Sequence, residues 1–352
     1  MTATVSGAAS TNVATTEQGI TGATAPAAAA SAPAGGDAQV DVERVSGVDR
    51  YKTAATISAK AYPTTAEVVY VASGTNFPDA VSAAPSAIHE NAPLLLTQAG
   101  QLPASTRAEI ARLDPEKIVI VGGSGVISNA VRDALKSLAP NVVRVAGTDR
   151  YSTSIALARY AFGTAGASTA YIATGNAFPD AMSAGAAAGS SNGPVILVNG
   201  SASTADSATR SLLSDLRTSK VKVIGGTAAV SAGIATSLGS GGKTVTRLSG
   251  SDRFETSIAT NANAFTSSST VYLATGYNYP DALAGSVLAG AQPAPMFVVP
   301  TTCVPSGVLA QIDAVGATDV VLLGGTTALQ TGVANLDICE TESTKVVAAP
   351  VS

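Results

Sequence analysis

The chain has 352 residues, a formal net charge of −4, and a composition that is 46% hydrophobic but only 12% charged. This length permits roughly two or three domains. The low charge and the abundance of small residues are typical of an extracellular surface protein rather than a cytosolic enzyme. A negative net charge excludes a global basic field for nucleic acid or an acidic membrane, and no apolar run reaches the ~20 residues needed for membrane insertion.

The chain begins with a stretch that has no core-forming face. Residues 1–41 are almost entirely Ala, Thr, Gly, Ser and Pro, a composition that predicts a disordered linker. No basic segment followed by an apolar segment comes after Met1, so we expect that an export signal has been removed. Residues 341–352 are predicted to form a flexible tail.

Three blocks of sequence recur three times in the same order. The first block has the pattern Arg-x-x-Gly-x-Asp-Arg-aromatic, the second has the pattern Gly-x-x-aromatic-Pro-Asp-Ala, and the third is a glycine pair after an apolar run. The blocks begin at Arg44, Arg144 and Arg247, at Gly74, Gly175 and Gly276, and at Gly122, Gly225 and Gly324. The sequence therefore predicts three repeats, over residues 42–141, 142–244 and 245–340.

From the first repeat into the start of the second, short β-rich runs alternate with stretches that have helical spacing. Strands are predicted over 68–72, 94–97, 118–121 and 142–145, and helices over 51–61, 79–89, 105–113 and 128–138. The apolar run Leu94–Leu96 and its counterparts are expected to form central strands. Apolar strands that alternate with helices predict an α/β fold with a mostly parallel sheet covered on both faces. Each repeat is therefore predicted to be one Rossmann-like domain.

The three blocks, in this order and register, resemble the cell wall binding repeat 2 family of Gram-positive surface proteins over about residues 42–340. The resemblance implies three Rossmann-like domains around a pseudo-threefold axis. It also implies non-covalent binding to an anionic secondary wall polymer, by which such a protein holds an effector on the cell surface. We therefore expect a secreted, monomeric protein at the cell wall, with no cofactor, no metal and no catalytic residues.

The charged and glycine residues of the blocks are the candidates for polymer binding. Asp49 and its two counterparts precede predicted helices and are expected to cap them. The arginine after each capping Asp can form a salt bridge with the Asp of the second block in its own repeat, which we favour, or can bind phosphate or carboxylate. The glycine pairs can cradle a phosphate or simply form tight turns. The candidates are Arg44, Arg50, Arg144, Arg150, Arg247, Arg253, Gly122, Gly123, Gly225, Gly226, Gly324 and Gly325.

The second block is interpreted as a helix start, with proline at the first helical position and Asp in the first turn. Asp79, Asp180 and Asp281 are therefore assigned a structural role. The helices that follow are dominated by small side chains. They are expected to let the repeats approach one another closely at a central axis.

The two cysteines, Cys303 and Cys339, are interpreted as a disulfide, which requires an oxidising compartment. A loop of this length stabilises the fold by about 4 kcal/mol in the chain-entropy model. The alternative is a pair of unrelated buried thiols.

Two other functions remain open. A wall hydrolase has little support, because His89 is the only histidine, has no counterpart in the other repeats and has no ligand cluster for a catalytic zinc. The glycine pairs lack the G-x-G-x-x-G order of a dinucleotide site.

The other alternative is a self-assembling surface-layer or adhesion protein, a function that overlaps with wall binding. Such a protein would assemble in a concentration-dependent way without wall polymer.

Overall fold

The computed structural model describes residues 40–177 and 179–339. Residues 1–39 of the predicted linker and the predicted tail over 341–352 lie outside these residues. In the described part, strands and helices alternate along the chain, as the composition of the first repeat predicts.

In residues 40–177 and 179–339, twelve strands form three separate four-stranded sheets, and every pair of neighbouring strands in these sheets is parallel. The first sheet has the order β3-β2-β4-β5, the second β7-β6-β8-β9 and the third β1-β12-β10-β11. Their bounds are β1 Asp41–Val45, β2 Val68–Ser73, β3 Leu94–Thr97, β4 Lys117–Val121, β5 Asn141–Val145, β6 Thr169–Thr174, β7 Val195–Val198, β8 Lys220–Ile224, β9 Thr244–Leu248, β10 Thr270–Thr275, β11 Met296–Val299 and β12 Asp319–Leu323.

The helices have the bounds α1 Arg50–Ala61, α2 Phe77–Val81, α3 Ala83–His89, α4 Ala104–Leu113, α5 Asn129–Leu135, α6 Arg150–Phe162, α7 Pro179–Ser190, α8 Ser207–Asp215, α9 Ala232–Leu238, α10 Arg253–Ala264, α11 Pro280–Ala291, α12 Ser306–Val315 and α13 Thr331–Ala334. The predicted Rossmann-like fold class is confirmed. The helix predicted over 79–89 is divided at Ser82 into α2 and α3, whereas its counterparts α7 and α11 are continuous.

The apolar run Leu94–Leu96 was wrongly predicted to be a central strand. It forms β3, and its counterparts form β7 and β11, which lie at the ends of their sheets. All three strands are nevertheless fully buried, because helices α1, α6 and α10 pack against them. Helix side chains also bind backbone amides of two of these edge strands, since Ser154 accepts a hydrogen bond from the Leu197 amide and Ser257 from the Val298 amide.

Sheets and sequence repeats are offset by one strand. β5, which carries the start of the second copy of the first block, completes the first sheet, and β9 completes the second. The third sheet is completed by β1, which pairs with β12 from Asp41 opposite Asp319 to Val45 opposite Leu323. The first described strand therefore closes the repeat that comes last in the chain.

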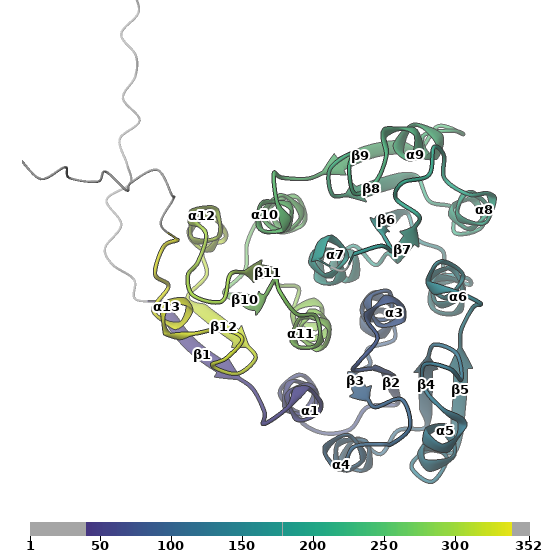
Figure 1. Ribbon diagram of the computed structural model, residues 1–352, viewed down its shortest axis with the longest axis vertical. Helices are drawn as coiled ribbons and strands as arrows, with labels where there is room; N and C mark the ends of the chain where they lie inside the picture. The colour runs from purple at the N-terminus through teal and green to yellow at the C-terminus, as the bar shows by residue number, and fades with distance from the viewer. Residues whose placement is uncertain (1–39, 178, 340–352) are drawn as a thin grey trace, which may run out of the picture. The chain divides into compact units, whose positions relative to one another are not determined.

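Helices α3, α7 and α11 meet in the middle of the three sheets (Figure 1). A Cβ atom on Gly185 of α7 would lie 2.8 Å from the hydroxyl of Ser286 on α11 and 3.7 Å from Ala84 on α3. Small side chains are therefore required where the three helices approach one another. The expected close packing between repeats is confirmed.

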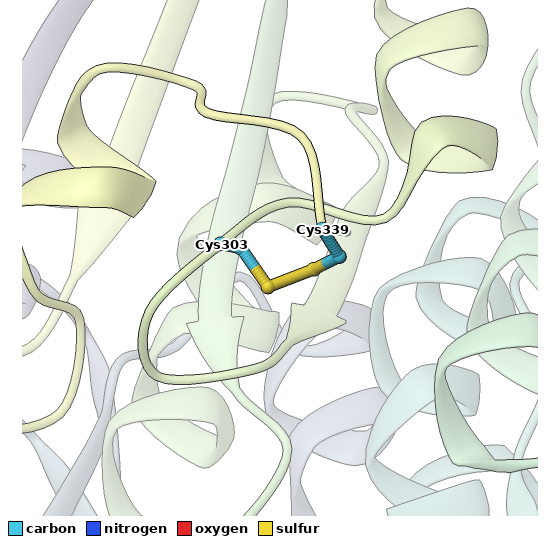
Figure 2. The surroundings of a disulfide bond; sticks show 2 residues. All are labelled: Cys303 and Cys339. Carbon is cyan, nitrogen blue, oxygen red and sulfur yellow. A yellow bond between two sulfur atoms is a disulfide. The ribbon is translucent and has the colours of Figure 1, made fainter. Parts of the chain in front are cut away.

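The two cysteines form a disulfide, as predicted (Figure 2). It joins the segment after β11 to the segment after α13, beside a bridge between Val304 and Ile338. In the first two repeats the corresponding helices, α5 and α9, lead directly into the last strand of the sheet. The disulfide therefore holds the end of the third repeat, whose last strand comes from the other end of the chain.

None of the helices in the described residues combines the length and the apolar character that crossing a membrane requires.

Candidate functional site

All three sequence blocks come together in three pockets, with volumes of about 300 Å³ between repeats 1 and 2, 290 Å³ between repeats 2 and 3, and 180 Å³ between repeats 3 and 1. Each pocket is named after the two repeats that form it. The 1/2 pocket is lined by Asn76, Asp79, Gly123, Gly125, Val126, Gly147, Thr148, Asp149, Arg150 and Thr153. The 2/3 pocket is lined by Ala177, Asp180, Gly226, Ala228, Ala229, Gly250, Ser251, Asp252, Arg253 and Thr256. The 3/1 pocket is lined by Gly47, Val48, Asp49, Arg50, Thr53, Asn278, Pro280, Asp281, Gly325, Thr327 and Ala328.

Each pocket is a junction between two repeats. One repeat supplies the second and third blocks, and the repeat that follows supplies the first block. The 3/1 pocket uses the third repeat and returns to the first block of the chain, which β1 brings next to β12. A single isolated repeat therefore lacks half of a pocket.

The first block forms a loop fixed by its own side chains. Asp49 caps α1 by accepting a hydrogen bond from the Lys52 amide, at 2.7 Å, and the counterparts Asp149 and Asp252 cap α6 and α10, as predicted. The Gly47 amide donates to the Thr53 hydroxyl at 3.0 Å, and equivalent bonds form at the other two junctions. These bonds hold the loop as one wall of the pocket.

The arginine that follows the capping Asp lines the pocket but is anchored to the second block of its own repeat. Arg50 donates to the carbonyl oxygen of Gly74 at 2.5 Å. Arg150 and Arg253 bind the carbonyl oxygens of Gly175 and Gly276 in the same way. Each guanidinium therefore joins the first block to the loop that leads toward the next pocket.

The favoured salt-bridge pairing of Arg50 with Asp79, and of its counterparts within their own repeats, was wrong. The electrostatic partner of Asp79 is Arg150, that of Asp180 is Arg253, and that of Asp281 is Arg50. The pairing is shifted by one repeat because each pocket combines the Asp of one repeat with the first block of the following repeat.

Burial raises the pKa of all three second-block aspartates, and the neighbouring arginines oppose this effect. The pKa of Asp281 is raised to about 6. At Asp79 a hydrogen bond from Thr153 also opposes the rise. Carboxylates held partly desolvated beside a guanidinium are typical of functional sites, although structural ion pairs also have this property.

The two glycines of each pair differ in their surroundings. Gly122 has φ of +101°, and a Cβ atom there would lie 2.6 Å from the Asp79 carboxylate, so this position requires glycine. Gly123 faces open space within the 1/2 pocket, and a Cβ atom there would meet nothing within 4 Å. Gly225 and Gly324, like Gly122, have a positive φ and leave no room for a Cβ atom beside the second-block Asp. Gly226 and Gly325, like Gly123, would place a Cβ atom in open space.

The glycine pairs open a turn, not a helix. The amides of Val126 and Ile127 donate to the Gly123 carbonyl, and α5 starts only after its cap at Ser128. The pairs therefore form tight turns, one of the two predicted alternatives, and no helix dipole points into the pocket from them. The second glycines remain candidates for contact with a ligand.

Arg44, Arg144 and Arg247 do not line the pockets. They donate to the carbonyl oxygens of Gly324, Gly122 and Gly225, at 2.8, 2.7 and 2.6 Å. Burial lowers the pKa of each of these arginines. Their geometry indicates that they hold the first glycine of each pair in its left-handed conformation.

The threonines of the pockets were not predicted from the sequence. Thr53, Thr153 and Thr256 each lie six residues after the glycine whose amide they bind. That constant spacing in all three repeats was the available signal. Asn76 and Asn278, in the second block, were also missed and line the 1/2 and 3/1 pockets.

An Asp281→Asn substitution tests the effect of burying this carboxylate. Because the folded protein binds the Asp281 proton more tightly than the unfolded chain, the free energy of unfolding is expected to fall as the pH rises from about 4 to about 6 and to level off above it. The substitution should reduce this decrease. Denaturant unfolding across that pH range measures it, and an identical pH dependence in both proteins contradicts the assignment.

Each pocket offers one guanidinium, which donates hydrogen bonds, and two carboxylates, which accept them. In the part of the chain that the structure describes, no three His, Cys, Asp or Glu side chains are grouped so that they could hold a metal ion. The arrangement suits a ligand that carries both hydroxyl and anionic groups.

Comparison with known proteins gives a consistent result. The sequence model of the family described as cell wall binding domain 2 (CWB2) matches residues 44–132, 144–235 and 247–334. The N-acetylmuramoyl-L-alanine amidase LytC of Bacillus subtilis (strain 168) is 33% identical over 294 residues, which cover 84% of this chain and 57% of LytC. The amidase enhancer of the same organism is 29% identical over 272 residues, which cover 77% of this chain and 36% of that protein.

Two solved structures, Cwp6 and Cwp8 from Clostridium difficile, match with TM-scores of 0.78 and 0.75 and sequence identities of 26% and 27%. The matches cover 84% and 85% of this chain, and 48% and 52% of those chains. The chain therefore spans only part of the length of each of these proteins. Because the three matched segments coincide with the three sequence repeats and cover most of the chain, it belongs to the CWB2 family of cell wall binding domains and contains three of them in tandem.

Proposed function

We propose that this chain is a non-enzymatic anchor that holds a secreted protein on a Gram-positive cell wall by binding an anionic secondary wall polymer in its three junction pockets. The observation that carries the proposal is that all three recurring blocks meet in each pocket, and that they do so three times. Three sites on one chain give avidity for a repetitive polymer without a high affinity at any one site.

The hydrogen-bonding groups of the pockets support this proposal. Asp149 is engaged by the amides at the start of α6, and burial raises the pKa of Asp79. Arg150 lies beside both residues in the 1/2 pocket. A polymer with anionic groups can bind the guanidinium, while its hydroxyl groups donate to the carboxylates.

A second candidate function is hydrolysis of the wall, because LytC is named as an amidase. This chain spans 57% of LytC, and the region that it matches contains the three CWB2 repeats. We infer that the likeness reflects wall binding and does not carry the amidase activity to this chain. Release of soluble fragments from purified walls by the chain alone would contradict this inference.

Co-sedimentation of the purified chain with Gram-positive walls tests the anchor proposal. We expect binding that is lost when the anionic polymers are extracted with acid and that weakens as salt is added. Binding that survives extraction would contradict recognition of the polymer. Oligomerisation in the absence of walls, measured by sedimentation velocity, would favour self-assembly instead.

A triple substitution of the second glycines, Gly123→Ala, Gly226→Ala and Gly325→Ala, is expected to weaken wall binding about tenfold or more without lowering the melting temperature. A methyl group at these positions meets no protein atom within 4 Å but narrows the pockets. Gly100→Ala is the matched control, because its Cβ atom also meets nothing within 4 Å and it lines none of the three pockets. Wild-type binding by the triple variant would exclude these pockets as the binding site.

A further inference from the structure

Tyr277 is an exposed aromatic side chain, with 58% of its surface accessible. Contacts with two neighbouring side chains, Phe254 and Arg253, orient the ring. It makes an edge contact with Phe254, with ring centroids 5.7 Å apart and planes at 80°, and the guanidinium carbon of Arg253 lies 5.7 Å from its centroid. The exposed tyrosine is therefore an oriented surface and not a freely rotating side chain.

Tyr277 lies between residues that belong to, or are bonded to, two different pockets. The residue before it, Gly276, accepts a hydrogen bond from Arg253, which lines the 2/3 pocket. The residue after it, Asn278, lines the 3/1 pocket. A polymer that occupies both pockets and follows this loop passes over the Tyr277 ring.

The corresponding positions in the first two repeats are Thr75 and Asn176, so the aromatic ring is specific to the third repeat. A second exposed apolar side chain occurs at the 3/1 pocket, which Asn278, the neighbour of Tyr277, also lines. Val48, in the lining of the 3/1 pocket, is 96% exposed, whereas its counterparts are Thr148 and Ser251. At these two positions the chain therefore carries an exposed aromatic and an exposed aliphatic side chain where the equivalent positions are polar, although the three pockets share the same charged groups.

We propose that Tyr277 is a stacking platform for a pyranose ring of the wall polymer. The proposal rests on the proposed function and assigns to the third repeat a contact that the other two repeats lack. A pyranose presents a face of C–H groups that packs against the flat face of an aromatic ring, while its hydroxyl groups remain free for polar partners. Those partners are the carboxylates of the adjoining pockets, Asp180 and Asp281.

The test compares Tyr277→Ala, Tyr277→Phe and Tyr277→Trp with the unsubstituted chain. Two measurements are made for each protein: co-sedimentation with intact walls, and calorimetric titration with the phosphate-free oligosaccharide released from the wall polymer by hydrofluoric acid. We expect Tyr277→Ala to weaken binding of the oligosaccharide about tenfold, and the two aromatic variants to retain binding. Ile338→Ala is the control, because Ile338 is similarly exposed, at 57%, and lies beside the disulfide.

Tyr277→Trp also provides a direct signal, because the chain contains no other tryptophan. We expect its fluorescence to change on addition of the oligosaccharide and to remain unchanged on addition of inorganic phosphate. Equal binding by the unsubstituted chain and Tyr277→Ala, with no response of the tryptophan, would overturn the platform and leave wall anchoring intact. Loss of binding in Tyr277→Phe would overturn stacking by assigning the contact to the hydroxyl group. If the unsubstituted chain does not bind walls, the anchor function itself fails.

Discussion

Loss of the Cys303–Cys339 disulfide is expected to lower the free energy of unfolding by about 4 kcal/mol. The two cysteines are 36 residues apart, and the loop that they close contains β12, α13 and the third glycine pair. Because Gly325 and Thr327 line the 3/1 pocket, the loosened loop should also weaken binding at that junction. Denaturant unfolding with and without a reductant measures the first effect, and wall co-sedimentation measures the second.

The double substitution Cys303→Ser and Cys339→Ser is the control for the reductant. This variant should have the stability of the reduced protein and should not respond to further reductant, since the described residues contain no free cysteine. An unchanged unfolding midpoint in the double variant would show that the contacts around β12 hold the loop without the covalent bond.

Features that depend on residues close together in the sequence were predicted correctly. Asp49 was identified as a helix cap because the carboxylate and the amide that it binds are three residues apart. β3 was predicted with its observed bounds because a short apolar run has few other structures available. The small residues of α7 and α11 predicted close helix packing because any larger side chain would separate the helices.

Features that depend on how the repeats meet were not predicted. The arginine whose charge acts on Asp281 is Arg50, more than 200 residues away in the sequence. No feature of the sequence around Asp281 favours Arg50 over Arg253, the equivalent arginine in the same repeat as Asp281. The closure of the third sheet by β1 was missed for the same reason. The edge position of β3, a feature within one repeat, was also not predicted; helix α1 packs against this strand and buries it. In each case the deciding contact is between elements, not within one.

A Gly122→Ala substitution is expected to lower the free energy of unfolding by about 3 kcal/mol. Gly122 has φ of +101°, a conformation that is strained for any residue with a side chain. A Cβ atom at this position would lie 2.6 Å from the Asp79 carboxylate, so a methyl group would displace a buried charged group of the 1/2 pocket. Thermal and denaturant unfolding measure the loss, and Gly123→Ala is the adjacent control with neither constraint.

A double-mutant cycle with Asp79→Ala separates these two causes. Removing the carboxylate relieves the steric conflict but leaves the backbone strain. Gly122→Ala should therefore be less destabilising in the Asp79→Ala background than in the unsubstituted chain. An equal loss in both backgrounds would mean that backbone conformation alone requires the glycine. A smaller loss would show that the recurring glycine and the recurring aspartate, which are 43 residues apart in the sequence, are retained as a matched pair in the wall of the pocket.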